Sequence, residues 1–191
     1  MQQKTRLAVI YGSNREPRLC DVVGGWALSR LEVQGGFAAD LVDPAAMALP
    51  PRLTREPDET MRGYRRRIED ADAFLIITPE YNHGYPAVLK FLIDSALEEW
   101  HDKPAAFVSY GGQSGGLRAV EQLRLVFAEL RVLTMRESVS FTNAWERFDD
   151  KGGLREPAAA NQAMASMLVD LARWSKALRD VRAVRAEPVL T

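Results

Sequence analysis

Residues 78–86 read Thr-Pro-Glu-Tyr-Asn-His-Gly-Tyr-Pro, and their position between two apolar segments decides the fold. Residues 73–77 before them have the pattern of a strand buried on both faces, and the segment from Pro86 has that of a helix opened by proline. The stretch is therefore a loop at the carboxyl end of a parallel strand, which is where open α/β sheets bind ligands. Its two tyrosines, amide, carboxylate and histidine, stiffened by prolines, predict a rigid platform for a flat ligand with polar edges.

Strand-like and helix-like segments alternate on either side of this loop. Such alternation predicts a parallel sheet with helices on both faces, and right-handed crossovers leave few topologies. We expect an α/β fold: a single doubly wound, flavodoxin-like domain over residues 1–191, with five strands in the order 2-1-3-4-5. Strands are expected at 7–11, 37–42, 73–78, 105–109 and 132–141, and helices at 19–33, 58–70, 86–99, 116–131 and 157–182.

The composition excludes several classes of protein. Twenty-five basic and 26 acidic side chains give a formal net charge of -1, whereas a nucleic-acid binder usually has a basic excess. No apolar run approaches the roughly 18 residues that span a membrane, and the amino terminus lacks the apolar core of a signal peptide. One cysteine, Cys20, and two distant histidines offer no disulfide and no metal site. We expect a cytoplasmic protein that binds neither nucleic acid nor membrane.

Two further loops should lie on the same edge of the sheet. Residues 12–18, Gly-Ser-Asn-Arg-Glu-Pro-Arg, follow the first strand and precede a helix. Guanidinium groups beside free helix N–H groups are typical of a phosphate site, although a plain turn with solvated arginines has the same composition. Residues 109–116, Ser-Tyr-Gly-Gly-Gln-Ser-Gly-Gly, follow the fourth strand, and their glycines let backbone come close to a ligand or simply make a tight turn.

Together these three loops resemble the NADPH-dependent FMN reductase family, from about residue 5 to about residue 178. The resemblance implies a flavodoxin-like fold and the reduction of quinones, azo dyes or chromate. One departure is Phe91, at a place where the family usually has a small amide. The segments that carry the resemblance are Gly12-Ser13-x-Arg15-x-x-Arg18, Pro79-Glu80-Tyr81-Asn82 with Pro86-Ala-x-Leu-Lys90-x-x-Ile-Asp94, and Ser109-Tyr110-Gly111-Gly112-x-Ser114-Gly115-Gly116.

The resemblance also implies roles for single residues. Ser13, Arg15 and Arg18 would hold the FMN phosphate. The isoalloxazine edge would lie along Pro79, Glu80, Tyr81 and Asn82, and the backbone of Ser109, Tyr110, Gly111 and Gly112 would close the other side. NADPH or NADH would be the cosubstrate and a small molecule the electron acceptor. We expect no catalytic side chain and no metal, because the cofactor carries the hydride chemistry.

Two alternatives to an FMN-dependent reductase remain open from the sequence. One is an electron carrier of the flavodoxin type, against which the near-neutral charge argues. The other is a module that binds a phosphorylated ligand without redox turnover. Glu80 is a candidate general base and His83 a candidate substrate contact. A purely structural role is the alternative for each.

The helix expected at 86–99 is apolar on nearly every side. Val88, Leu89, Leu92 and Ile93 cover one wide face, and Phe91 adds another. Such a helix is either fully buried or shared with a second subunit. The family resemblance implies dimers or tetramers, and together with this helix it leads us to expect a homodimer or a homotetramer.

Overall fold

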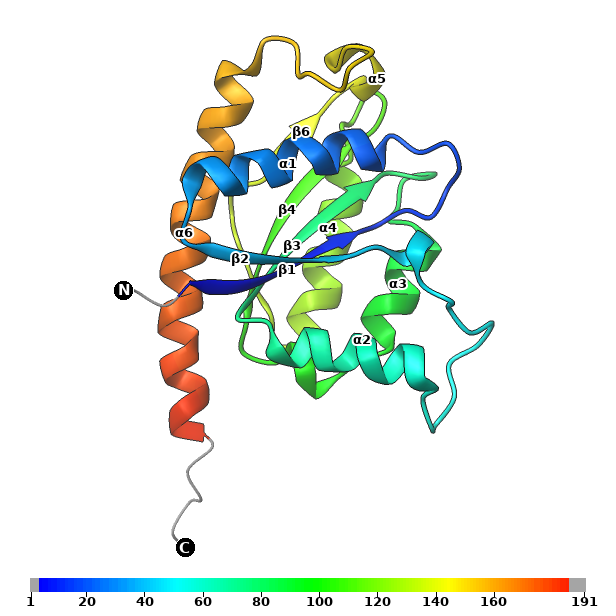
Figure 1. Ribbon diagram of the computed structural model, residues 1–191, viewed down its shortest axis with the longest axis vertical. Coiled ribbons are helices and arrows are strands. Elements are labelled where there is room, and N and C mark those ends of the chain that lie inside the picture. The colour runs from blue at the N-terminus through cyan, green and yellow to red at the C-terminus, as the bar shows by residue number, and fades with distance from the viewer. Residues whose placement is uncertain (1–3, 186–191) are drawn as a thin grey trace, which may run out of the picture.

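The computed structural model describes residues 4–185, which form a parallel sheet covered by helices on both faces (Figure 1). The strand order within this part of the chain is β2-β1-β3-β4-β5, and β6 also pairs with β4. The predicted flavodoxin-like fold and strand order are therefore confirmed. The strands are β1 (Thr5–Tyr11), β2 (Phe37–Val42), β3 (Ala73–Pro79), β4 (Pro104–Tyr110), β5 (Leu133–Thr134) and β6 (Val139–Phe141).

The helices lie in two layers (Figure 1). Helices α1 and α6 cover one face of the sheet, and α2, α3 and α4 cover the other, each face with its own hydrophobic core. No helix among the described residues is long and apolar enough to cross a membrane. The bounds are α1 (Cys20–Gln34), α2 (Glu59–Asp70), α3 (Ala87–Asp94), α4 (Leu117–Glu129), α5 (Ala144–Arg147) and α6 (Pro157–Arg185).

The central strand β3 is buried along its whole length, as its apolar run predicts. Alternate side chains of a strand point to opposite faces, so Leu75 and Ile77 enter the core under α1 and α6. Phe74 and Ile76 enter the core under α2, α3 and α4. The sheet thus brings the carboxyl ends of β1, β3 and β4 to one edge, with the loops that follow them side by side.

The strand expected at residues 132–141 is divided in two. β5 pairs with the start of β4, β6 pairs with its end, and the chain leaves the sheet between them. Arg136 and Glu137 stand in this gap, and their charged side chains remain in water instead of entering the sheet. Arg124 of α4 donates hydrogen bonds to the carbonyls of Met135 (2.6 Å) and Arg136 (2.9 Å), which here have no strand partner.

Three further elements differ from expectation. Helix α3 ends at Asp94, and the rest of the predicted helix contains a short 3-10 turn, Glu98–Trp100. The side chain of Ser95 bonds back to the carbonyl of Phe91 (2.6 Å), which helps to end the helix there. Helix α5 was not expected, and α6 runs three residues past the predicted end at 182.

Candidate functional site

The loop after β1 begins at Gly12, where the backbone turns away from the sheet. The Gly12 N–H donates to the carbonyl of Ile77 at 2.7 Å, so this loop leaves the sheet directly beside β3. A Cβ on Gly12 would lie 3.0 Å from Thr78 Oγ1 and 3.1 Å from the Ile77 carbonyl. A side chain here would crowd both atoms, so this close approach favours glycine.

Ser13 and Tyr81 join the loop after β1 to the loop after β3. Their hydroxyl oxygens lie 2.8 Å apart, and Ser13 is fully buried. The backbone N–H of Arg15 also donates to Ser13 Oγ, at 3.3 Å. The Arg15 guanidinium lies over the Tyr81 ring, 4.0 Å from its centre, and no carboxylate among residues 4–185 forms an ion pair with it. Arg15 is thus a held cation available to an anion.

Arg18 has very different surroundings, although it lies in the same loop. Its guanidinium donates to Asp43 (2.7 and 2.5 Å), to Asp21 and to the Ser13 carbonyl (2.5 Å). Its Nε also donates to Asp21, so every N–H group of the guanidinium is in use. The hydrogen bonds from Arg18 hold the pKa of the Asp43 carboxyl below its usual range. Arg18 therefore braces the backbone of this loop against the end of β2.

The platform loop after β3 closes in a tight hairpin. Tyr81 and Gly84 exchange two backbone hydrogen bonds (2.9 and 3.1 Å), and Asn82 and His83 occupy the corner with φ of 49° and 72°. Both corner side chains are exposed. Gln122 of α4 donates to the His83 carbonyl at 2.8 Å and fixes the turn from outside. Hydrogen bonds thus hold this turn closed from inside and outside.

Glu80 links the loop after β3 to the loop after β4. Its carboxylate accepts from Ser114 Oγ (2.6 Å), from the Arg118 backbone N–H (3.1 Å) and from Arg118 Nη1 (3.0 Å). Burial opposes the charge, but these donors hold the pKa of Glu80 below its usual value. Glu80 is a structural anchor at the start of α4, because three donors hold its carboxylate there in the charged form.

The loop after β4 offers backbone, not side chains. Ser109 is fully buried and donates to the Gly115 carbonyl at 2.9 Å, and the Tyr110 side chain points into the core under α1. Gly111 and Gly112 are half-buried on the rim. Gly116 has φ of +88°, and a Cβ on it would lie 2.7 Å from that of Ser109, so the turn into α4 requires glycine.

A hollow of about 680 Å³ adjoins Arg15, between residues 14–18 and residues 44–49. The predicted residues Ser13, Arg15, Pro79, Glu80, Tyr81, Asn82, Gly111 and Gly112 all lie on this edge of the sheet. Ser109 and Tyr110 present only their backbone there. The edge thus combines an uncommitted cation, exposed backbone and a stiff polar corner, which fits a phosphorylated planar cofactor.

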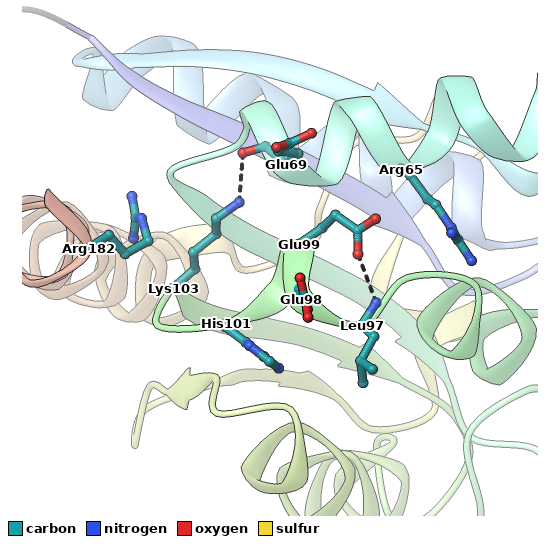
Figure 2. A pocket seen from close by; sticks show the side chains of 8 residues that line it. All are labelled: Arg65, Glu69, Leu97, Glu98, Glu99, His101, Lys103 and Arg182. Carbon is teal, nitrogen blue, oxygen red and sulfur yellow. Dashed lines mark hydrogen bonds between the residues drawn. The ribbon is translucent and has the colours of Figure 1, made fainter. Parts of the chain in front are cut away.

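A second hollow, of about 610 Å³, lies at the opposite end of the sheet (Figure 2). Lys103 extends into its wall and donates to the carbonyls of Ile68 and Glu69, both at 2.7 Å, at the end of α2. Burial lowers the pKa of Lys103 to about 8. Figure 2 shows Arg182 of α6 beside Lys103, with Glu98 and Glu99 across the opening. Acidic and basic groups are mixed here, and none of the predicted site residues is near.

Four residues of the rim received no functional or structural role from the sequence. Asp43 directly follows β2, so its place at a strand end was a usable signal. Ser114 stands in the loop before α4 and was quoted only as part of the loop motif, and Arg118 lies in the first turn of α4, where a carboxylate partner is common. Trp145 lies on α5 beside Gly112, and no periodicity in the sequence points to it.

The fold and this edge define a class: flavodoxin-like proteins whose ligand site lies at the carboxyl ends of β1, β3 and β4. Residues 5–146 match the NADPH-dependent FMN reductase family. The chain belongs to that family, which confirms the resemblance drawn from the three loops. It is accordingly an NAD(P)H-dependent oxidoreductase that uses FMN, and nothing in the comparisons supports a flavodoxin-type carrier.

The relatives and solved structures agree with this assignment. The chain is similar to an NAD(P)H-dependent FMN reductase of Schizosaccharomyces pombe, 36% identical over 138 residues, covering 66% of this chain and 68% of the relative. It is also similar to a quinone reductase of Pseudomonas putida, 34% identical over 166 residues, covering 82% and 88%. The fold matches the flavoenzyme NAD(P)H:(acceptor) oxidoreductase FerB from Paracoccus denitrificans, with a TM-score of 0.71, 24% identity, and coverage of 90% and 97%.

Proposed function

We propose that the protein binds FMN along this edge and carries reducing equivalents from NAD(P)H to a quinone or a similar small acceptor. The observation that carries the proposal is the rim itself, in which three strand-end loops are cross-linked around an uncommitted guanidinium, that of Arg15. When bound, FMN supplies the hydride chemistry. The chain supplies binding, orientation and an electrostatic setting.

In this proposal Ser13, Arg15 and the backbone N–H groups at the start of α1 hold the phosphate. A cation and free helix N–H groups together stabilise an anion. Arg18, included with them on the family pattern, acts one step removed, because its N–H groups are already taken by Asp21, Asp43 and Ser13. It is a positioning residue for the phosphate loop.

The ring would lie against Pro79, Glu80, Tyr81 and Asn82, with the backbone of Gly111 and Gly112 opposite. Asn82 is exposed at the hairpin corner and offers both a donor and an acceptor to a polar ring edge. Glu80 contributes through its place in the loop, since its carboxylate is held by Ser114 and Arg118. No side chain of the rim is needed to move a proton.

Anaerobic addition of NADPH to protein loaded with FMN tests the proposal. We expect the yellow colour to bleach and then to return when a quinone is added. Flavin that stays oxidised would indicate an electron carrier, and protein that takes up no FMN would leave only a phosphate-binding module. NADH in place of NADPH gives the nucleotide preference.

Arg15→Ala tests the phosphate anchor. We expect FMN affinity to fall about 10-fold or more, since a hydrogen bond to a charged group contributes about 1.5–3 kcal/mol. Arg173→Ala on α6 is the matched control, because it removes one exposed arginine far from the rim. Equal FMN affinity in Arg15→Ala and wild type would place the anchor elsewhere.

A homodimer or homotetramer through α3 and α4 is also part of the proposal. Phe91 on α3 is half-buried, Leu97 just beyond α3 is exposed, and Leu117 and Leu125 of α4 are exposed. Apolar side chains on two helices of one layer support a subunit contact. Light scattering at working concentration tests this subunit contact, and a monomeric mass would contradict it. Cytoplasmic location, where NADPH is available, is tested by cell fractionation.

A further inference from the structure

Trp145 exposes its indole ring beside the ligand loops. Its side chain is 61% exposed, whereas Trp26 and Trp100 are buried in the two cores. Leaving so large an apolar surface in water is unfavourable. An exposed ring at the edge of a ligand site is therefore a candidate contact for whatever enters that site.

The indole is held firmly against the loop after β4. Backbone hydrogen bonds join Ala144 to Gly111 (3.1 Å), Asn143 to Gly112 (3.0 Å) and Gly111 to Phe141 (3.2 Å). The Cη2 atom of Trp145 lies 3.5 Å from the point where a Cβ on Gly112 would stand. The ring therefore stands over Gly112, at a distance where a Cβ on that residue would just touch it.

Trp145 takes no part in the core packing that anchors its own helix. Helix α5 is anchored by its neighbours, because Ala144 is fully buried and Phe148 packs edge-on against Phe141 with ring centres 5.2 Å apart. Trp145 lies between these anchors but outside the core cluster that contains them. The element therefore holds the indole at the rim without using it for packing.

We propose that Trp145 is the stacking wall for the planar ring of the electron acceptor, which is a quinone or a comparable flat aromatic. The indole face is electron-rich and a quinone ring is electron-poor, so offset stacking is favourable. No charged group is needed for this contact. The inference rests on the proposed function and assigns one further residue of this chain to the same site.

Steady-state kinetics of the FMN-loaded enzyme give the first test, with menadione and ferricyanide as acceptors. Ferricyanide is a compact octahedral ion that offers no ring to stack. In Trp145→Ala we expect the ratio of KM for menadione to KM for ferricyanide to rise about 3- to 10-fold, and Trp145→Phe to recover most of it. Trp174→Ala is the matched control, since Trp174 is also exposed but lies on α6 next to Ser175, which bonds to Asp72 at the opposite end of the sheet.

Tryptophan fluorescence gives a second readout that needs no turnover. Menadione is titrated into the oxidised, FMN-loaded protein without NAD(P)H, with N-acetyltryptophanamide as the correction for absorbance. We expect saturable quenching in wild type and in Trp174→Phe, and loss of most of that quenching in Trp145→Phe. Equal quenching in Trp145→Phe and Trp174→Phe would overturn the inference.

Three other results would also overturn it. A drop in FMN affinity in Trp145→Ala would make the ring a cofactor contact, and a change in light-scattering mass would make it a contact between copies. An unchanged KM ratio would remove the stacking role directly. Failure of the proposed function looks different, because then wild type itself oxidises no NAD(P)H, while the quenching titration still tests Trp145.

Discussion

Arg15 and Arg18 stand three residues apart in one loop and have different tasks. Arg15 lies on the Tyr81 ring without a carboxylate partner among the described residues, so its charge is open to a ligand. Arg18 is enclosed by Asp21 and Asp43, and its side chain is only 9% exposed. The two arginines look equivalent in the sequence, because the difference in their surroundings comes from Asp43 at the end of another strand.

The substitution Asp43→Asn tests whether Arg18 braces the loop or binds the phosphate directly. If Arg18 braces the loop, Asp43→Asn and Arg18→Ala both weaken FMN binding, and both lower the free energy of unfolding by about 1–3 kcal/mol. Calorimetric titration with FMN and urea denaturation measure the two effects. Tighter FMN binding in Asp43→Asn would contradict this, since it would mean that the carboxylate competes with phosphate for Arg18.

At the scale of elements, the start of α4 is fixed by Glu80 from a different loop. We expect Glu80→Gln to lower the free energy of unfolding by about 1–2 kcal/mol at neutral pH, because a buried charge-assisted bond is lost. Glu121→Gln on the same helix is the control, since the Glu121 carboxylate is 74% exposed and its pair with Arg124 should contribute under about 1 kcal/mol.

The free energy of unfolding of wild type and that of Glu80→Gln should also depend differently on pH. The pKa of Glu80 is lowered in the folded state, so its stabilisation is present above the usual carboxyl pKa and is lost as pH falls through the folded value. The stability gap between wild type and Glu80→Gln should therefore narrow in acid. A gap that is constant from neutral pH to pH 3 would show that the charge contributes nothing.

The elements that set the fold could be read from the sequence because their patterns are long and local. The apolar run of β3 and the loop with its prolines specify a buried strand followed by a stiff turn, and the structure has both. The strand at 132–141 was placed correctly but not its interruption, because there the carbonyls of Met135 and Arg136 accept hydrogen bonds from Arg124 of α4, which is distant in sequence. Helix α5 is too short for any period to reveal it.

The position of the candidate site could be predicted from the sequence, but the contacts within it could not. Ser13, Arg15 and the hairpin at Asn82 follow from loop position and residue type, so the edge of the sheet was found. The partners that decide what each side chain does were not found, since Asp43, Ser114 and Arg118 are distant in sequence from Arg18 and Glu80. Pairs between side chains at the ends of different strands depend on the tertiary structure, and local sequence patterns contain little information about them.

At the scale of the whole molecule, Lys103 lies where α2, β4 and α6 meet, at the end of the sheet away from the proposed flavin site. It is 5% exposed and donates to the last carbonyls of α2, while Arg182 of α6 donates to the neighbouring Asp102 carbonyl at 2.8 Å. Burial disfavours its charge and lowers its pKa to about 8, well below the usual lysine value.

Lys103 should therefore make wild type relatively more stable as pH rises. Between pH 8 and the unfolded-state pKa of about 10.4, the unfolded chain binds the proton more tightly than the folded one, so deprotonation favours folding. The free energy of unfolding of wild type minus that of Lys103→Met should grow by about 2–3 kcal/mol from pH 7 to pH 10.5. Guanidinium denaturation along the pH series measures it, with Lys176→Met on the exposed side of α6 correcting for the loss of one positive charge. A difference that falls with pH would mean that the charged form is the one the fold stabilises, through the two α2 carbonyls.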